Sequence, residues 1–533
     1  MERLYFGGTI LGMEKEGERI EALLVRDGRI AAVGDLDEVK NSAGSTCEKV
    51  DLQGNTLCPG FIDGHSHVTM LAMALSMLNL TGSKSFDEII DRIKAYVREK
   101  EPEDGQWIFA YGYDHNLLNE GRHPDKMVLE KAGIPNPVLM THASGHMGVL
   151  NRRGLDEMKI SADTKDPEDG FFGRMEGSRE PNGYLEEGAF FHTTAMIPKT
   201  PADQVLKNME QSQNLYFSNG ITTMQEGYAK RSELEILKDF SASGKMKAEI
   251  IAYMDEKEYA ELPAENPSYD GIYKENLKIG GYKIFLDGSP QGRTAWMCAP
   301  YAQAEDGYRG YPIYSDEEVL QFMERAYAEG RQILVHCNGD AAAKQMISCC
   351  KEAQKRNPQK QIRPVMIHAQ LVRRDQLPQM RALGIIASFF VAHTYYWGDI
   401  HYKNFGAERA NYISPVRSAI DAGVMINFHQ DTPVIQPNMM ETIWCAVNRK
   451  TREGRILGKE ERCSVWEAME AVTKWAAFAY FEEDRKGTLA KGKLADLVIL
   501  DKNPLTCQDE ELREIQVLQT IKKGEIVYTK ERK

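Results

Sequence analysis

The stretch PGFIDGHSH at residues 59–67 places two histidines, His65 and His67, directly after a short apolar run. In extended backbone, residues i and i+2 point to the same side, so both imidazoles can bind one divalent cation. Two polar histidines on a solvated loop would give the same letters. The context favours the metal site, because the run 56–62 resembles a buried strand, and parallel barrels carry their chemistry where strands end.

Length and composition limit the class of protein. The 533 residues exceed one ordinary domain, whereas an α/β barrel commonly takes about 250 residues, so one large domain plus a smaller one fits. The hydrophobic fraction of 42% and the charged fraction of 27% are those of a globular protein with a sizeable core. The 44 glycines are spread along the chain, which argues against low complexity.

Charge and cysteine content exclude several partners. The chain has 79 acidic and 66 basic residues, a net charge of −13, without a lysine or arginine cluster, so no nucleic-acid partner is expected. It lacks both a signal-like N-terminus and an apolar run of about 18 residues, which predicts a cytoplasmic protein without membrane contact. Nine cysteines without C-x-x-C spacing do not predict a disulfide framework.

Both ends of the chain consist of short apolar runs. Residues 1–58 contain several of them, two separated by the turn signal RDGR at 26–29. Residues 485–533 repeat this texture. Because neither end has enough strands for a stable sheet alone, we predict that the two ends pair into one small β-sandwich domain.

Residues 59–484 alternate β-type runs with helical stretches, which predicts βα units and a parallel sheet. Eight runs can be counted as barrel strands: 57–62, 137–140, 221–224, 282–286, 332–335, 364–367, 384–388 and 424–428. The predicted fold class is therefore α/β, a (β/α)8 TIM barrel. About 75 to 80 residues separate each of the first three runs, and we expect these connections to place loops over the barrel mouth.

Further metal-binding side chains follow later strands. His336 ends the fifth run, His368 ends the sixth, and Asp431 follows the eighth. A single histidine in such a place is usually a satisfied core or loop residue. Four imidazoles and one carboxylate at strand ends instead predict a catalytic metal site.

Lys283 lies inside the apolar run YKIFL at 282–286. Burial disfavours the ammonium form, and a neutral amine can take up carbon dioxide to become a carboxylated lysine, an anionic ligand able to bridge two metals. A lysine paired with Asp287, or pointing out between helices, is the alternative.

The chain resembles the amidohydrolase superfamily, specifically the amidohydrolase-3 branch of N-substituted formamide deformylase-like metal-dependent hydrolases. The resemblance spans nearly the whole chain and is carried by motifs in this order: PGFIDGHSH at 59–67, GYDHN at 112–116, SGHMGVLN at 144–151, NGYLEE at 182–187, GITTMQEG at 220–227, KIFLDGSPQGRTA at 283–295, VHCNGD at 335–340, IHAQ at 367–370, HQDTPV at 429–434 and GTLAKGKLADLVILD at 487–501. Several of these motifs are weak evidence for the family when taken singly, but their occurrence in this order is highly specific.

The resemblance implies one or two divalent metal ions, zinc first, with iron and manganese as alternatives. It implies His65 and His67 as ligands of the more buried ion, and carboxylated Lys283 as the bridge. His336 and His368 would complete the second position. Asp431 resembles the family's catalytic aspartate, which touches the metal and shuttles the proton.

The resemblance also implies substrate-side groups, for which His115, His146, Arg293 and Glu226 are the candidates. Glu226 could instead bind a metal if Lys283 does not. Two departures from the family pattern concern this region: Ser144 stands where an aspartate is usual, and His429-Gln430 precede Asp431 in place of Gly-Ser. The histidine at 429 could be a hydrogen-bonding group behind the ligands.

The expected activity is hydrolysis of a non-peptide C–N bond in a small molecule, such as an N-acyl or N-formyl amine. A metal lowers the pKa of bound water towards ~7. Asp431 would take the proton of that water and return it to the leaving nitrogen.

Alternatives remain open. A mononuclear deaminase-like or cyclic amide hydrolase would leave Lys283 unmodified. A catalytically silent barrel would bind a metabolite around a structural zinc, although such zinc sites generally close with four protein ligands. The family resemblance suggests a homodimer.

Overall fold

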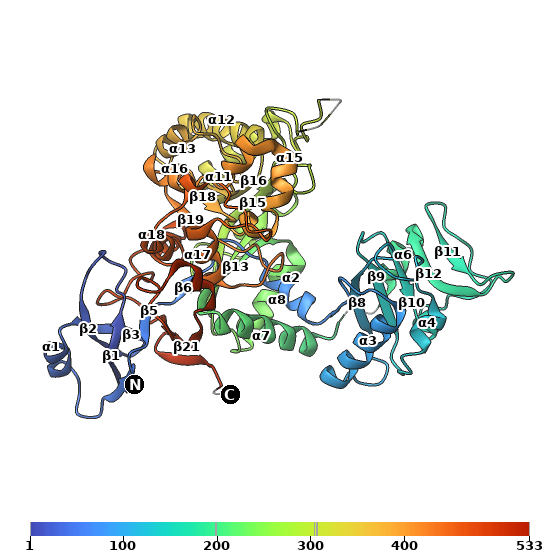
Figure 1. The fold of residues 1–533 in the computed structure, drawn as a ribbon, viewed down its shortest axis with the longest axis horizontal. Helices are drawn as coiled ribbons and strands as arrows, with labels where there is room; N and C mark the ends of the chain where they lie inside the picture. The colour runs from blue at the N-terminus through green and yellow to red at the C-terminus, as the bar shows by residue number, and fades with distance from the viewer. Residues whose placement is uncertain (1, 198–199, 303, 305–306, 532–533) are drawn as a thin grey trace. The chain divides into compact units, whose positions relative to one another are not determined.

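The computed structural model describes residues 2–197, 200–302, 304 and 307–531. The chain forms two compact units, Met1–Leu71 with Met209–Lys533, and Ala72–Asn208. Figure 1 shows both units.

The larger unit contains a parallel sheet of eight strands in the order β19-β18-β17-β16-β15-β14-β13-β6. Its two edge strands meet at their carboxyl ends, where Gly64 N donates to Phe428 O at 3.3 Å and Ser66 pairs with Thr432 in a parallel bridge. The sheet therefore curls round on itself. The strands are β6 (Phe61–Ile62), β13 (Ile221–Ala229), β14 (Glu249–Asp255), β15 (Leu277–Phe285), β16 (Gln332–Cys337), β17 (Val365–His368), β18 (Ile386–Phe389) and β19 (Ile426–Phe428).

Helices follow these strands in the sequence, and Figure 1 shows several of them around the outside of β15 to β18. α11 begins with a capping box of Ser315 and Glu318 and ends at Gly330, whose φ of 72° suits the left-handed cap. The helices are α7 (Ala202–Ser218), α8 (Arg231–Ala242), α9 (Glu256–Tyr259), α10 (Leu262–Glu265), α11 (Asp316–Glu329), α12 (Asp340–Arg356), α13 (Leu377–Leu383), α14 (His393–Tyr396), α15 (Gly398–Asn411), α16 (Val416–Asp421), α17 (Met439–Asn448), α18 (Val465–Ala471) and α19 (Lys474–Ala479).

One of the eight barrel-strand predictions is wrong. The run 137–140 forms β9 (Val138–His142), which belongs to the sheet of the smaller unit. The strand that takes its place in the parallel sheet is β14, whose residues are all buried. An apolar run indicates that a strand exists, but it does not specify which sheet the strand joins.

Strands from both ends of the chain pair in one further sheet of the larger unit, in the order β22-β21-β20-β5-β1-β2-β3, with β4 beside β1. The two ends join where β20 pairs antiparallel with β5, with Val498 opposite Cys58. The predicted pairing of the termini is therefore present as one mixed sheet. The strands are β1 (Glu2–Ile10), β2 (Ile20–Arg26), β3 (Arg29–Gly34), β4 (Glu48–Asp51), β5 (Thr56–Pro59), β20 (Leu497–Leu500), β21 (Val517–Lys522) and β22 (Glu525–Thr529).

The smaller unit is built on a six-stranded sheet in the order β11-β12-β10-β9-β8-β7. β8 and β9 run parallel, and β9, β10, β12 and β11 pair antiparallel. α3 buries Ile89, Ile90 and Ile93 against this sheet's core. The elements are β7 (Leu78–Asn79), α3 (Phe86–Lys100), β8 (Ile108–Tyr113), α4 (Lys126–Glu130), β9 (Val138–His142), β10 (Met147–Leu150), α5 (Arg152–Glu157), β11 (Gly170–Arg174), β12 (Pro181–Glu187) and α6 (Gly188–Met196).

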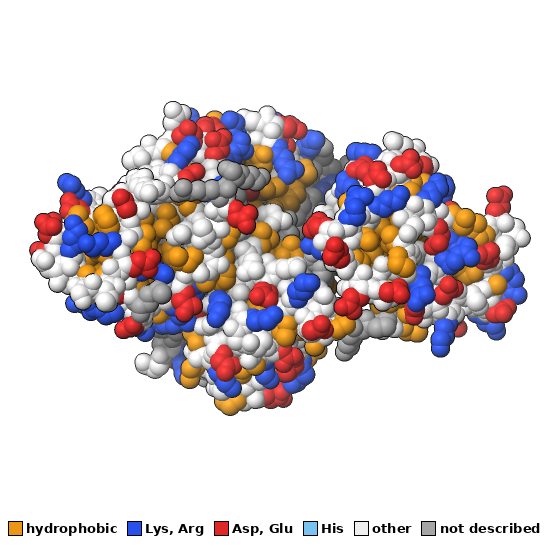
Figure 2. All heavy atoms as spheres, turned by 90° about the horizontal axis from the view of Figure 1, so that it is seen from below, with side chains coloured by type: hydrophobic (Ala, Val, Ile, Leu, Met, Phe, Trp, Pro, Cys, Tyr) orange, Lys and Arg blue, Asp and Glu red, His pale blue; other side chains and the backbone are white. Residues whose placement is uncertain are grey.

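Charged side chains of both signs are interspersed on the face drawn in Figure 2. Among the described residues, no helix combines the length and the apolar character needed to cross a membrane.

Candidate metal centre

The structure brings together, within the larger unit, all six side chains predicted to bind metal. His65 and His67 follow β6, Lys283 lies in β15, and His336 lies in β16. The other two are His368, the last residue of β17, and Asp431, which follows β19. Because all of these strands run parallel, their carboxyl ends lie at one rim of the sheet.

One group of these atoms surrounds the Oδ1 atom of Asp431. Nε2 of His67 lies 3.4 Å from Oδ1, and Nε2 of His65 lies 3.6 Å from it. Nζ of Lys283 lies 3.1 Å from Nε2 of His65. This group thus combines two imidazoles, one carboxylate and one amine.

A second group faces the other oxygen of the same carboxylate. Nε2 of His368 lies 3.9 Å from Oδ2 of Asp431 and 3.0 Å from Nδ1 of His336. Asp431 therefore lies between the two groups, with one oxygen towards each of them.

In three of the rings, the nitrogen that points away from Asp431 has a hydrogen-bond partner. The other nitrogen of each ring faces the centre of the site. Nδ1 of His65 lies 2.5 Å from Oε1 of Gln225, and Nε2 of His336 lies 3.2 Å from the carbonyl oxygen of Gly288. Nδ1 of His368 lies 3.2 Å from Nε2 of His429. Metal-binding histidines generally show this arrangement, because the outer partner fixes the ring and its tautomer.

The donor set fits a divalent transition ion. Ligands in a tetrahedral site at 2.0–2.1 Å from the ion lie about 3.3 Å from one another. The separations of 3.0 to 3.9 Å between these ligand atoms bracket that value. Imidazole and carboxylate ligands suit zinc, iron and manganese.

Burial sets the protonation of the site. It lowers the pKa of His65 and His368 well below the usual value and that of His336 to about 4, so these imidazoles are neutral and carry a lone pair. Burial also lowers the pKa of Lys283 to about 7. For Asp431, burial acts to raise the pKa, but the hydrogen bond from His67 and the electrostatic effect of that ring outweigh it and hold the pKa well below its usual range.

The backbone at two of these positions adopts an uncommon conformation. His368 has a φ of 71° and Asp431 a φ of 54°, both in the left-handed region that residues other than glycine rarely adopt. Such residues occur frequently at functional sites, where the surrounding structure holds them in place. Glycine is required at position 64, since a Cβ there would lie 2.7 Å from the carbonyl oxygen of Phe428.

Glu226 lies behind His67. Its Oε2 accepts hydrogen bonds from Thr69 N at 2.9 Å and Thr69 Oγ1 at 2.6 Å, and its Oε1 lies 3.5 Å from Nδ1 of His67. Both Oε1 and that Nδ1 are buried without a hydrogen-bond partner in the described structure. This places the carboxylate on the side of the ring opposite Nε2, the nitrogen that faces Asp431.

The remaining candidates are Arg293, His115 and His146. The Arg293 guanidinium lies 5.4 Å from the ring centre of Tyr301, in the loop that follows β15. His115 and His146 belong to the smaller unit, where Nδ1 of His146 lies 3.1 Å from Oε2 of Glu187. The substrate-side role of these three residues stays a prediction.

Sequence reasoning missed several groups behind the ligands. Gln225 holds His65, and Ser388 Oγ lies 2.8 Å from Nδ1 of His429. Asp287 accepts the backbone N–H groups of Asn338 and Gly339, which follow His336 closely in the chain. The signal in the sequence for Gln225 is the polar pair Gln225-Glu226 inside the buried strand β13.

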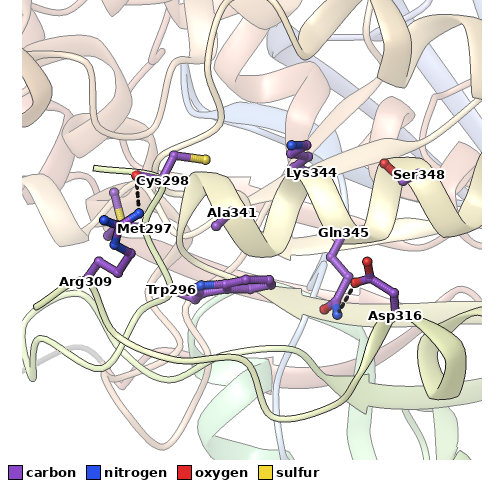
Figure 3. Close-up of a pocket in the computed structure, with 9 residues that line it drawn as sticks. All are labelled: Trp296, Met297, Cys298, Arg309, Asp316, Ala341, Lys344, Gln345 and Ser348. Carbon is purple, nitrogen blue, oxygen red and sulfur yellow. Dashed lines mark hydrogen bonds between the residues drawn. The ribbon is translucent and has the colours of Figure 1, made fainter. Parts of the chain in front are cut away.

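A cavity of about 420 Å³ lies beside the loop that follows β15. Trp296 lines it, and its backbone N–H donates to Oδ2 of Asp287 at 2.9 Å. Figure 3 shows the indole ring facing side chains of α12. None of the six candidate ligands lines this cavity, so it is separate from the metal centre.

Comparison with known proteins decides the family. Residues 48–528 match the Amidohydrolase family (Amidohydro_3). The chain belongs to this family. The family model matches most of the length of this amidohydrolase, and the matched range contains all six candidate ligands.

Individual relatives agree with this assignment. The amidohydrolase is 28% identical to an N-substituted formamide deformylase of Arthrobacter pascens, over 95% of both chains. It is 25% identical to the putative amidohydrolase YtcJ of Bacillus subtilis, over 99% of this chain and 100% of that one. An uncharacterized metal-dependent hydrolase from Pyrococcus furiosus has a similar structure, with a TM-score of 0.78, 26% identity, and coverage of 95% of this chain and 100% of that one.

Proposed function

We propose that this amidohydrolase uses divalent metal to hydrolyse a non-peptide C–N bond in a small molecule, with N-formyl or N-acyl amines as the substrate class. The similarity to an N-substituted formamide deformylase supports this class. The single observation that carries the proposal is the position of Asp431, whose two oxygens face two separate groups of imidazole nitrogens.

In this proposal His65, His67 and Asp431 would hold the first ion, and His336 and His368 would hold a second. When bound, the metal lowers the pKa of its water to about 7 and polarises a carbonyl oxygen. Zinc is the first choice, and iron and manganese have the same ligand preferences.

Asp431 accepts and then transfers the proton. Its low pKa keeps it ionised, so it can accept a proton at one oxygen when water adds to the carbonyl carbon. As the C–N bond breaks, the same proton passes to the leaving nitrogen, which departs as a neutral amine. The carboxylate is thereby returned to its ionised state.

Lys283 acts as the bridge in this proposal. Its buried amine, with a pKa of about 7, is largely able to react as the free base near neutrality. The Nζ–C bond to carbon dioxide forms with loss of one proton, which gives a carbamate. Its two oxygens extend beyond the position of Nζ, which lies 3.1 Å from Nε2 of His65.

The proposal includes other expectations from the sequence. These are the β-sandwich form of the terminal sheet, a cytoplasmic location, a homodimer, and His115, His146 and Arg293 as groups that contact the substrate.

A panel of N-formyl amines, N-acyl amines, cyclic amides and aminopurines tests the function. The chain should be stripped of metal and then assayed with added Zn²⁺, Mn²⁺ or Fe²⁺. We expect release of the amine from an N-formyl or N-acyl amine. Release of ammonia from the heterocycles instead would support a deaminase, and no turnover with any metal would contradict the proposal.

Asp431→Asn tests the proton acceptor. The amide keeps the shape of the side chain but cannot accept the proton, so we expect kcat to fall roughly 10²- to 10⁴-fold. Asp163→Asn is the matched control, because its side chain is 95% exposed. Activity that persisted in Asp431→Asn would overturn this assignment.

A further inference from the structure

A second cluster of metal-ligating side chains lies wholly inside the smaller unit. Asp114 and His115 directly follow β8, and His142 is the last residue of the neighbouring parallel strand β9. One ligand atom from each of the three residues lies within 4.8 Å of the other two. Apart from the substrate contact proposed for His115, the proposed hydrolysis uses this cluster neither for a metal nor for proton transfer.

The separations between the ligand atoms suit a metal ion. Nδ1 of His115 lies 3.2 Å from Nε2 of His142. Oδ1 of Asp114 lies 3.6 Å from that Nε2 and 3.9 Å from that Nδ1. Tetrahedral ligands of zinc lie about 3.3 Å apart, and the three separations of 3.2 to 3.9 Å bracket this value.

Neighbouring groups orient these ligands. Nδ1 of His142 lies 2.9 Å from Oγ of Ser144, so its Nε2 is the nitrogen that faces the cluster. The backbone N–H and the side-chain amide of Asn116 donate to Oδ1 of Asp114 at 2.9 and 3.0 Å, and they hold the carboxylate in place. The backbone N–H of Ser144 donates to the same Nδ1 of His142 at 3.0 Å, so binding of an ion at Nε2 requires the ring proton to move to Nδ1, where Oγ of Ser144 can accept it.

The third ligand is also held in place. The ring of His115 stacks on His123 with 3.9 Å between their centres, and Nδ1 of His123 lies 3.1 Å from the hydroxyl oxygen of buried Tyr113. His142 is buried, whereas about 30% of the Asp114 side chain is exposed to solvent. An ion can therefore reach the cluster from water.

We propose that Asp114, His115 and His142 form a binding site for a first-row divalent transition ion, with zinc as its first occupant. Two imidazoles and one carboxylate leave at least one coordination position for water. The ion joins the carboxyl ends of β8 and β9, so it also stabilises the sheet of this unit. All of its ligands belong to residues 72–208, and none of them is among the six candidate ligands of the centre at Asp431.

Metal content of the full-length chain tests this site. Each variant should be stripped with a chelator, reconstituted with Zn²⁺, passed over a desalting column and analysed by elemental mass spectrometry. We expect His142→Gln and the double variant Asp114→Asn/His115→Gln each to hold one zinc ion per chain fewer than the wild type. His192→Gln is the control, because this histidine of the same unit is 62% exposed and should leave the zinc content unchanged.

A barrel variant separates this proposal from the proposed function. His65→Asn/His67→Asn should lose zinc at the Asp431 centre and keep the ion that His142→Gln loses. Co²⁺ absorption gives a second readout, since His142→Gln should remove one set of visible bands. Equal zinc content in the wild type and in the folded Asp114→Asn/His115→Gln variant would overturn the proposal, whatever the barrel variant does.

Discussion

Nε2 of His429 lies 3.2 Å from Nδ1 of His368, on the side of the ring opposite the atoms that face Asp431. Burial lowers the pKa of His429 to about 3, so this ring is neutral. A neutral ring that accepts a hydrogen bond from His368 at Nε2 must carry its own proton at Nδ1, where Ser388 Oγ lies 2.8 Å away. The series Ser388, His429, His368 therefore fixes the tautomer of a candidate ligand.

His429→Ala should weaken metal binding without removing a ligand. Loss of such an outer partner typically lowers metal affinity 10- to 100-fold, and we expect an effect of that size. Competition with a chromophoric chelator measures it. His429→Gln should recover part of the affinity, because its amide oxygen can accept from His368. If alanine and glutamine variants bind metal as tightly as the wild type, His429 does not position His368.

Lys283 should carry a carbamate in the metal-loaded chain. Reconstitution in ¹³C-labelled bicarbonate should give a carbamate carbon signal by NMR, and the signal should disappear on acidification, which releases carbon dioxide. Lys283→Met should lack the signal and retain less metal. Lys351→Met, an exposed residue of α12, is the control. A fully active chain without the signal would favour a site with unmodified Lys283.

Removal of metal should abolish activity and lower thermal stability. An ion present at 100 times its dissociation constant stabilises the folded state by about 2.7 kcal/mol per site. Calorimetry before and after chelation measures the change in the melting temperature, and added Zn²⁺ should reverse it. His336→Asn/His368→Asn should show a smaller increase on addition of Zn²⁺. The same increase in this variant and in the wild type would remove these two histidines from the ligand set.

Glu482 predicts acid sensitivity in the larger unit. Burial acts to raise its pKa, but Lys486, at 2.6 Å, and Lys278 outweigh this effect and hold the pKa at about 2, below the usual 4.5. A lowered folded-state pKa contributes stability that is present above pH 4.5 and is lost as the pH falls towards 2. The full contribution is on the order of 3 kcal/mol.

Glu482→Gln should therefore lower the melting temperature at pH 7, and the difference from the wild type should shrink on acidification to pH 3. Glu510→Gln, at a 58% exposed side chain, is the control and should change little at either pH. A difference that stays constant from pH 7 to pH 3 would contradict the ionic origin of this stability.

Part of the site could be predicted from the sequence because its signals are local. The H-x-H spacing of His65 and His67 specifies a shared side of extended backbone. A histidine at the end of an apolar run, as at 336 and 368, specifies a side chain at the rim of a parallel sheet. The fold class followed from the same alternation of runs, since most of those runs are strands of the curled sheet.

Other features could not be predicted, because they depend on contacts between distant parts of the chain. β14 is as apolar as β9, yet only tertiary packing decides that β14 joins the parallel sheet and β9 joins the other one. The hydrogen bond between Gln225 and His65 joins residues 160 positions apart. A local pattern carries no information on such a partner.

The sequence by itself thus determined the family motifs, the alternation of strands and helices, and the six side chains, Asp431 among them, that meet at the rim of the parallel sheet. The tertiary structure alone decided which nitrogen of each ring faces inward, because that depends on hydrogen bonds from other strands. It also decided that Asp114, His115 and His142 meet, since β8 and β9 become neighbours only when their hydrogen bonds form.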